Sequence, residues 1–243
     1  MVIYKKKEKN VTDDDPAECG DVYTLTTMES NTKLFISHHE GRRSTDDATE
    51  LFNDFESKRS NTTPIPLFTS DDWDPFKAAL LNVYGSLEQP PYCGIGRKPL
   101  PVLVPPEDLM YAQVCKKVTS GHVDEMRRRV VFGDTEEILR IFEGDSGGCI
   151  NTSYIERINL TIRNSLARFI RKGMNCSKSA LMHSRAIDFF QAWYNFVKPH
   201  KSLRLMINCG NKKWLQRTPA MAQKIADHIW TLKELLTFRA PVQ

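Results

Sequence analysis

Two acidic residues far apart in the sequence, Asp71 and Glu156, are placed where they could bind a metal ion together. Asp71 follows the short apolar run 66–70, which predicts a buried strand, and Glu156 falls in the first turn of a long predicted helix. Carboxylate oxygens are the ligands that Mg²⁺ and Mn²⁺ prefer. Two such ions about 4 Å apart can activate a nucleophile and neutralise the charge that develops on a phosphodiester. The pair is therefore compatible with metal-dependent phosphoryl transfer.

Each carboxylate also has an ordinary structural interpretation. Asp71 could begin the turn that precedes Asp74, where Asp74-Pro75 is typical of a helix start. Ser153-x-x-Glu156 matches a capping box, in which the glutamate returns a hydrogen bond to the helix start. The spacing of the residues leaves both interpretations open beside the metal site.

The elements that would position these residues follow from hydrophobic periodicity and from turn residues. Alternating and β-rich runs predict a hairpin, apolar residues at helical spacing predict helices, and six prolines loosen the pattern in the middle of the chain. We expect a hairpin over 21–27 and 33–37, a helix over 45–58, a strand over 66–70, a helix from Asp74, strands over 111–117 and 128–132, a helix over 135–142, a long helix after Gly148 and a helix over 179–196.

This order of elements predicts one α/β domain over residues 1–243, with a central mixed sheet and helices on both faces. Residues 85–148 would form an insertion before the Glu156 helix, and residues 179–243 a helical C-terminal region. The chain has 243 residues and 40% hydrophobic content, which is enough for one ordinary core. No run approaches the roughly 20 apolar residues of a membrane span, and the first residues lack the pattern of a signal peptide. We therefore expect no membrane partner and a cytosolic protein, or a nuclear one in a eukaryote.

Positive charge is concentrated in residues 157–204. The net charge of the chain is only +4, but this segment contains Asp188 as its single acid. Its cations are Arg157, Arg163, Arg168, Arg171, Lys172, Lys178, Arg185, Lys198, Lys201 and Arg204. Such a segment predicts a basic surface suited to the phosphates of nucleic acid.

Several motifs, in a fixed order over nearly the whole chain, resemble DDE-type transposases of bacterial insertion sequences. Residues 69–76, Thr-Ser-Asp-Asp-Trp-Asp-Pro-Phe, resemble the turn that holds the second catalytic Asp of that group. Residues 151–163 resemble its helix with the pattern Glu-Arg-x-Asn-x-Thr-x-Arg. Similar segments follow at 171–172, 177–178, 194–197, 199–204, 218–222 and 228–232, and upstream at 20–26 and 32–34.

The resemblance implies an RNase H-like catalytic domain that cleaves and transfers DNA strands. By it, Asp71 and Glu156 are the second and third metal ligands of a site for two Mg²⁺ or Mn²⁺ ions. Its implied partners are double-stranded DNA and a second copy or a full-length transposase, in the cytoplasm near the nucleoid. The residues expected to face DNA are Asn159 and Arg163 on the Glu156 helix, and Arg171, Lys172, Lys178, His200, Lys201 and Arg204 at backbone phosphates.

One departure from the family concerns its first catalytic Asp. In that group this Asp lies a few residues before a segment similar to 4–10, and here no carboxylate precedes Tyr4. We therefore expect a chain truncated before that Asp, in which Glu29 occupies a turn position of the family and not a ligand position. Such a chain would neither cleave nor join DNA. The alternative function is a non-catalytic DNA-binding or inhibitory transposase fragment.

Other patterns suggest chemistry less specifically. Gly144-Asp145-Ser146-Gly147-Gly148 matches the nucleophile segment of chymotrypsin-like peptidases, but no histidine has that family's Ala-Ala-His-Cys context, which favours a glycine-rich loop. His38 and His39 are adjacent on a predicted strand, so they should point to opposite faces and not form a metal pair. Trp193, Tyr194 and Phe196 could stack on bases, yet aromatics at helical spacing more often fill a core.

Overall fold

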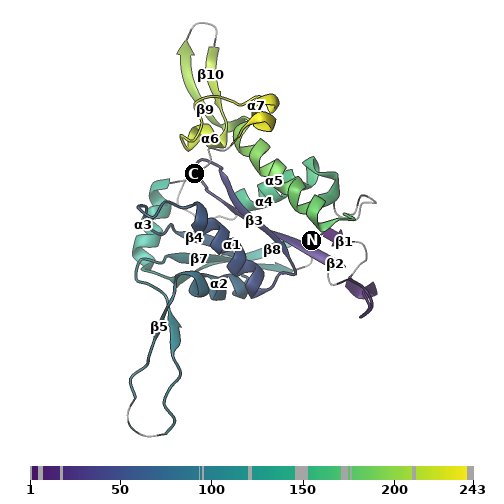
Figure 1. Cartoon of the computed structure of the whole chain (residues 1–243). Helices are drawn as coiled ribbons and strands as arrows, with labels where there is room; N and C mark the ends of the chain where they lie inside the picture. The colour runs from purple at the N-terminus through teal and green to yellow at the C-terminus, as the bar shows by residue number, and fades with distance from the viewer. Residues whose placement is uncertain are drawn as a thin grey trace. The chain divides into compact units, whose positions relative to one another are not determined.

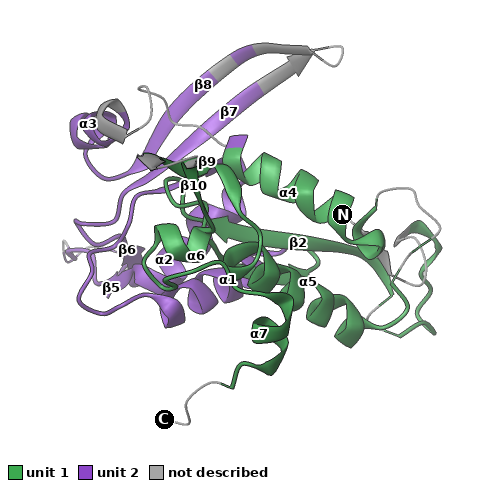
Figure 2. Ribbon diagram, turned by 90° about the horizontal axis from the view of Figure 1, so that it is seen from above, with its two compact units in different colours: residues 1–42, 154–243 green, residues 43–153 purple. Residues whose placement is uncertain are grey.

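The computed structural model describes residues 2–4, 8–16, 19–92, 94, 96–119, 122–145, 153–170, 175, 177–209 and 212–239. The chain forms two compact units, shown in different colours in Figure 2. Unit 1 consists of Met1–Arg42 and Tyr154–Gln243, and unit 2 of Arg43–Ser153. The described residues form a mixed α/β structure with seven α-helices and four small sheets, in place of the one central sheet that the sequence suggested (Figure 1). No helix in the described ranges is long and apolar enough to cross a membrane.

Unit 2 is built on a three-stranded sheet in the order β4-β7-β8. β4 (Phe68–Asp71) runs parallel to β7 (Tyr111–Thr119), and β8 (His122–Phe132) runs antiparallel to β7. The segment that the sequence suggested to be an insertion thus supplies two of the three strands of this sheet. A separate antiparallel pair, β5 (Ser86–Glu88) and β6 (Val102–Val104), completes the strands described in this unit.

Helices cover both faces of the β4-β7-β8 sheet. α1 (Thr45–Lys58) begins at a capping box formed by Ser44 and Asp47, and α2 (Asp74–Tyr84) begins with a proline in its first turn, as expected. Phe68 of β4 packs edge-on against Phe52 and Phe55 of α1, with ring centroids 5.4 Å apart in each pair. On the opposite face, α3 (Thr135–Asp145) buries Ile138 against the alanine and valine side chains of β7. The sheet that ends at Asp71 is therefore held from both sides.

Unit 1 contains the antiparallel sheet β1-β2-β3 and most of the C-terminal half of the chain. The strands are β1 (Val2–Tyr4), β2 (Gly20–Met28) and β3 (Phe35–Gly41), with the 3₁₀ turn η1 (Glu8–Asn10) after β1, and the β2–β3 pair confirms the expected hairpin. The long helices are α4 (Ser153–Ser165) and α5 (Ala180–Phe196), followed by the short helices α6 (Pro219–Ala222) and α7 (Leu232–Thr237), with η2 (Ala167–Phe169) between α4 and α5. The C-terminal region also contains the antiparallel pair β9 (His200–Cys209) and β10 (Lys212–Arg217), so it is not wholly helical.

Phe35 is the residue around which the core of unit 1 is assembled. Its ring is almost fully buried and lies edge-on to Phe190 and Tyr194 of α5, at 6.5 Å in each case. Ile158 and Ile162 of α4 belong to the same buried cluster. One side chain from a strand therefore joins the two long helices, and Tyr194 serves this core as the helical spacing suggested.

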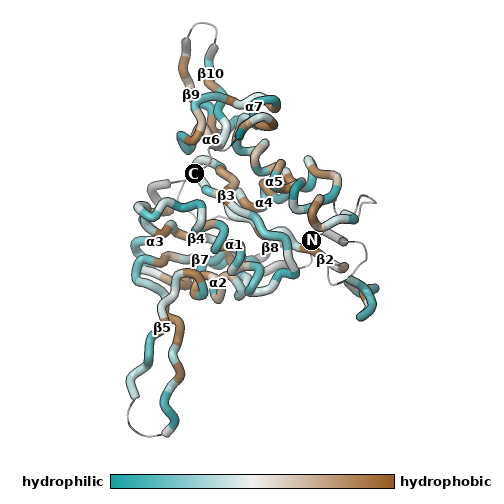
Figure 3. The backbone as a smooth tube through the Cα atoms, in the orientation of Figure 1, coloured by the Kyte–Doolittle hydropathy of each residue, from teal (hydrophilic) through white to brown (hydrophobic). Residues whose placement is uncertain are grey.

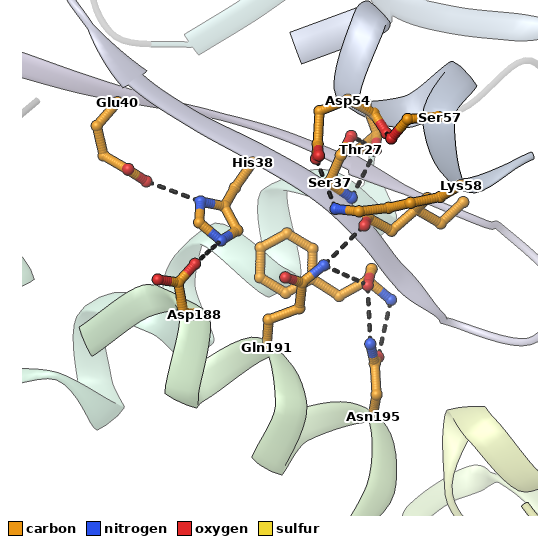
Figure 4. Close-up of polar contacts among 12 residues, drawn as sticks. Thr27, Ser37, His38, Glu40, Asp54, Ser57, Lys58, Asp188, Gln191 and Asn195 are labelled. Carbon is orange, nitrogen blue, oxygen red and sulfur yellow. Dashed lines mark hydrogen bonds and ion pairs between the residues drawn. The ribbon is translucent and has the colours of Figure 1, made fainter. Parts of the chain in front are cut away.

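A β-bulge explains how Phe35 reaches that core. Thr27 pairs with Ser37 and Met28 with Phe35, so β3 advances by two residues where β2 advances by one. The extra residue removes backbone groups from the ladder. Side chains of α5 replace the lost partners: Asn195 accepts from the backbone N–H of Phe35 at 2.9 Å and donates to its carbonyl at 2.8 Å, and Gln191 donates to the same carbonyl at 2.9 Å (Figure 4). The bulge and the two amides together fix β3 to α5.

Candidate functional site

Asp71 is the last residue of β4, at the carboxyl end of a strand that lies parallel to its neighbour. Its side chain is exposed, while its backbone carbonyl accepts hydrogen bonds from the Ser70 hydroxyl at 2.7 Å and from the Trp73 N–H at 2.9 Å. No residue of the described ranges forms a hydrogen bond or ion pair with the Asp71 carboxylate. The backbone here is held firmly, and the carboxylate points to solvent.

A row of polar side chains crosses the sheet beside Asp71. Ser70, Gln113 and Arg129 stand opposite one another on β4, β7 and β8. The Tyr111 hydroxyl lies 2.7 Å from the Ser70 hydroxyl and accepts from Gln113 Nε2 at 2.9 Å, and Arg129 donates to Gln113 Oε1. Burial raises the pKa of Tyr111, so this phenol stays neutral. Tyr111 and Gln113 are buried, and their bonds to the half-buried Ser70 and the exposed Arg129 support the end of β4.

The same row distinguishes Asp71 from the acid that follows it. Arg129 Nη2 donates to Asp72 Oδ1 at 3.1 Å, in addition to its bond with Gln113. Asp72, the residue after β4, is thereby engaged in a half-exposed ion pair with Arg129 of β8. Of the two adjacent carboxylates, Asp71 is the one available to a metal ion.

Glu156 lies in the first turn of α4, and its side chain is exposed. The buried side of this helix carries Ile158 and Ile162, which belong to the Phe35 cluster. Asn159, one turn after Glu156, accepts a hydrogen bond from the Thr26 hydroxyl of β2 at 3.4 Å. Residues three and four apart share a helix face, so Glu156, Asn159 and Arg163 form one stripe beside the buried one. Asn159 is engaged with β2, which orients this stripe.

The structure divides the two predicted metal ligands between the units: Asp71 belongs to unit 2 and Glu156 to unit 1. Within the described ranges, no three His, Cys, Asp or Glu side chains form a group that could hold a metal ion. The shared site stays a prediction. The capping interpretation of Glu156 also stays open, because Thr152, which precedes α4, lies outside the described residues.

The residues expected to contact DNA occupy several elements of unit 1. Lys178 is exposed just before α5, and Lys201 and Arg204 are exposed on β9. Arg163 is half-buried on α4. Arg171 and Lys172 lie outside the described residues, as do residues 146–148 of the peptidase-like segment.

His200 differs from the other residues expected at phosphates. Its ring is 4.5 Å from that of Tyr194, edge-on, and its Nε2 is buried with no hydrogen-bond partner among the described residues. Burial, reinforced by the charges of Lys198 and Lys33, lowers the pKa of His200 to about 4. At neutral pH the ring is therefore neutral, and a phosphate contact would have to be made without a positive charge.

The depressed pKa predicts a pH dependence of stability. The unfolded histidine has a pKa near 6.5, so stability from the neutral ring is complete above that value and is lost as the pH falls toward 4. Because the ring is partly exposed, we expect the free energy of unfolding to fall by about 1–2 kcal/mol over this range. Urea unfolding of the His200→Gln variant between pH 7 and 4.5 should show a flatter profile than the parent by this amount. The His39→Gln variant is the control, and an equal flattening there would contradict the assignment to His200.

Another histidine, His38, ties β3 to α5. Its Nδ1 lies 2.9 Å from Glu40 Oε1 and its Nε2 3.1 Å from Asp188 Oδ1, as Figure 4 shows. Burial raises the pKa of Glu40, but the contacts with His38 outweigh it, so the pKa of Glu40 lies below its usual value. His38 and His39 are adjacent and were not expected to form a metal pair. In the structure His38 joins β3 to α5.

A surface cavity of about 730 Å³ lies in the C-terminal part of unit 1. Residues from Met221 to Phe238 line it, including Trp230 and the pair His228 and Glu234. His228 lies 2.6 Å from Asp227 Oδ1 and 3.3 Å from Glu234 Oε1. None of the residues expected from the sequence to bind metal or DNA lines this cavity.

Comparison of the chain with protein-family models, with curated proteins and with solved structures finds no match.

Proposed function

We propose that this chain is a catalytically impaired form of a domain for metal-dependent DNA strand cleavage and transfer, of the kind found in the DDE-type transposases that its motifs resemble. The observation that carries the proposal is the end of β4. Asp71 is exposed there and unpaired with the described residues, next to Asp72, which Arg129 holds in an ion pair. In sheets with parallel strands, ligands bind outside the carboxyl ends of the strands. Asp71 has this position, because β4 is parallel to β7.

An RNase H-like domain is the fold that we propose for this function. In its support, the three antiparallel strands β1, β2 and β3 are followed along the chain by α1, β4 and α2. After the β5–β6 pair comes β7, which runs parallel to β4. The helix that carries Glu156 comes later, as in the family that the motifs resemble. In this proposal Asp71 and Glu156 are two of the carboxylates that bind Mg²⁺ or Mn²⁺.

The metal would supply the activation of a water or a 3′-hydroxyl and the neutralisation of phosphate charge. The residues of the chain would position the DNA. Arg163 shares a helix face with Glu156 and would contact phosphates near the reacting bond. Exposed cations, with Lys178, Lys201 and Arg204 among them, would engage the backbone further away, and Arg171 and Lys172 are proposed to join them. A second copy of the chain or a full-length transposase is the proposed protein partner, and the bacterial nucleoid the proposed location.

A second candidate function is DNA binding without catalysis. It is favoured by the finding that no metal-binding group of three side chains exists within the described ranges. Both candidates predict DNA binding, so they must be separated by the role of the metal ion.

The separating experiment measures duplex-DNA affinity with and without Mn²⁺. An ion held by Asp71 and Glu156 cancels their negative charge and contacts phosphate oxygens, so Mn²⁺ should strengthen binding about tenfold, or about 1.4 kcal/mol. Asp71→Asn should raise the metal-free affinity slightly and abolish the response to Mn²⁺. The matched control is Asp74→Asn, which alters a neighbouring exposed acid and should keep the response. Equal affinities with and without Mn²⁺ in the parent chain would favour the non-catalytic candidate.

A further inference from the structure

The hairpin formed by β9 and β10 projects from the rest of unit 1 as a separate two-stranded sheet (Figure 1). Trp214 pairs with Met206 and Leu215 with Leu205, and the register shifts on both sides of these pairs. A two-stranded hairpin alone is marginally stable in water. This one is a candidate for an element that is completed by a partner.

All the charge on the hairpin is positive. Residues 200–217 contain no acid, and their cations are Lys201, Arg204, Lys212, Lys213 and Arg217. The side chains of Lys201, Arg204 and Lys213 are exposed, and none of them has an ion pair with a residue in the described ranges. Arg204 lies over the Trp214 ring at 4.0 Å, which fixes its guanidinium on one face of the hairpin. Such a surface complements a polyanion.

The hairpin also exposes apolar side chains between its cations. The exposed fractions are 45% for Leu205, 56% for Met206, 39% for Ile207 and 43% for Leu215. Figure 3 shows both brown, hydrophobic stretches and teal, hydrophilic stretches along β9 and β10. A hairpin that bound DNA through its charges alone would not need exposed apolar side chains. Apolar side chains that accompany cations are typical of elements that contact base edges or base steps inside a DNA groove.

We propose that the β9–β10 hairpin is a ribbon that enters a groove of duplex DNA. Lys201, Arg204 and Lys213 contact phosphates, and Met206 contacts bases inside the groove. The major groove is wide enough for a two-stranded ribbon. The inference rests on the proposed function only in taking duplex DNA as the partner, and it requires neither Asp71 nor Glu156.

The first test is the salt dependence of binding to a labelled duplex, measured in EDTA. Each phosphate contact contributes about 0.9 to the slope of log affinity against log salt. The triple variant Lys201→Gln, Arg204→Gln, Lys213→Gln should flatten the slope by about 2–3 units. A double variant that retains Arg204, and with it the contact to Trp214, should flatten it by about 2. The control triple variant Lys77→Gln, Arg97→Gln, Lys98→Gln lies in unit 2 and should keep a steeper slope than either hairpin variant.

The second test separates the apolar contact from the charges. Met206→Gln should weaken binding roughly fivefold without changing the salt slope, because no phosphate contact is lost. Leu87→Gln, at an exposed position on β5, is its control and should leave affinity unchanged. A photo-crosslinker at position 206 should label the DNA, and one at position 87 should not.

The two tests have outcomes that overturn the proposal. An unchanged slope in both hairpin variants would show that the hairpin does not contact phosphates. Sedimentation that shows self-association lost in Met206→Gln, with unchanged DNA affinity, would assign the hairpin to a second copy of the chain. Since EDTA removes metal, a failure of the shared metal site leaves these results unaffected, and a failure of the hairpin leaves the Mn²⁺ tests unaffected.

Discussion

A saturating concentration of Mn²⁺ is expected to raise the melting temperature of this chain, and Asp71→Asn or Glu156→Gln is expected to abolish the increase. Binding to the folded state alone stabilises by about 2.7 kcal/mol at one hundred times the dissociation constant. For a chain of this size that corresponds to a shift of about 5–10 °C. If both carboxylates bind the same ion, either substitution removes the site. The measurement is a thermal melt of each variant with and without Mn²⁺.

Two comparisons make this prediction specific. Asp74→Asn changes an acid in the same turn as Asp71 and should keep the full shift with Mn²⁺. If Glu156 only caps α4, Glu156→Gln should leave the melting temperature and its shift with Mn²⁺ nearly unchanged, because glutamine also serves in a capping box. A shift with Mn²⁺ that survives unchanged in both Asp71→Asn and Glu156→Gln would contradict the metal site and favour the capping interpretation.

Phe35→Ala is expected to destabilise unit 1 by about 3–5 kcal/mol. The substitution removes a buried ring that contacts Phe190 and Tyr194 of α5 and belongs to the same cluster as Ile158 of α4. The cavity left by the missing ring cannot collapse easily, since Asn195 and Gln191 hold the backbone of residue 35 in place. Urea unfolding measures the loss.

The control for Phe35→Ala is Phe189→Ala, which truncates a phenylalanine of α5 that is 44% exposed. This change should cost less than about 1 kcal/mol. If both substitutions cost the same, Phe35 is not the residue that joins the sheet to the helices. A loss in Phe35→Ala should also weaken the position of α4, and with it any Mn²⁺ response that depends on Glu156.

The sequence predicted the elements whose signals are local. Residues 45–58 form a helix with the expected bounds, because Ser44 and Asp47 cap it and its apolar residues recur at helical spacing. Asp74-Pro75 begins α2, and Thr135 begins α3. The β2–β3 hairpin also follows from alternation, although the bulge at Phe35 could not be read from it. A bulge depends on the amides of Asn195 and Gln191, which lie about 160 residues away in sequence.

The strand pairings and the β9–β10 hairpin could not be predicted in this way. Residues 85–148 looked like an insertion because prolines interrupt their pattern. They nevertheless contain β7, which pairs with β4 beside Asp71. The hairpin after His200 lacks clean alternation, because Leu205, Met206 and Ile207 follow one another and the register shifts. At the candidate site, the sequence identified Asp71 and Glu156. It could not reveal that Arg129 engages Asp72, or that burial of His200 keeps its ring neutral.

The most direct test of the central claim, that Asp71 and Glu156 bind one metal site, is iron-mediated cleavage of the chain. Fe²⁺ binds carboxylate sites that accept Mn²⁺, and with ascorbate and peroxide it generates radicals that cut the polypeptide close to the ion. A shared site predicts cuts near residue 71 and near residue 156 that Mg²⁺ suppresses. It also predicts that Glu156→Gln removes the cuts near residue 71, and that Asp71→Asn removes those near residue 156. Cuts near residue 71 that persist in Glu156→Gln would contradict the account.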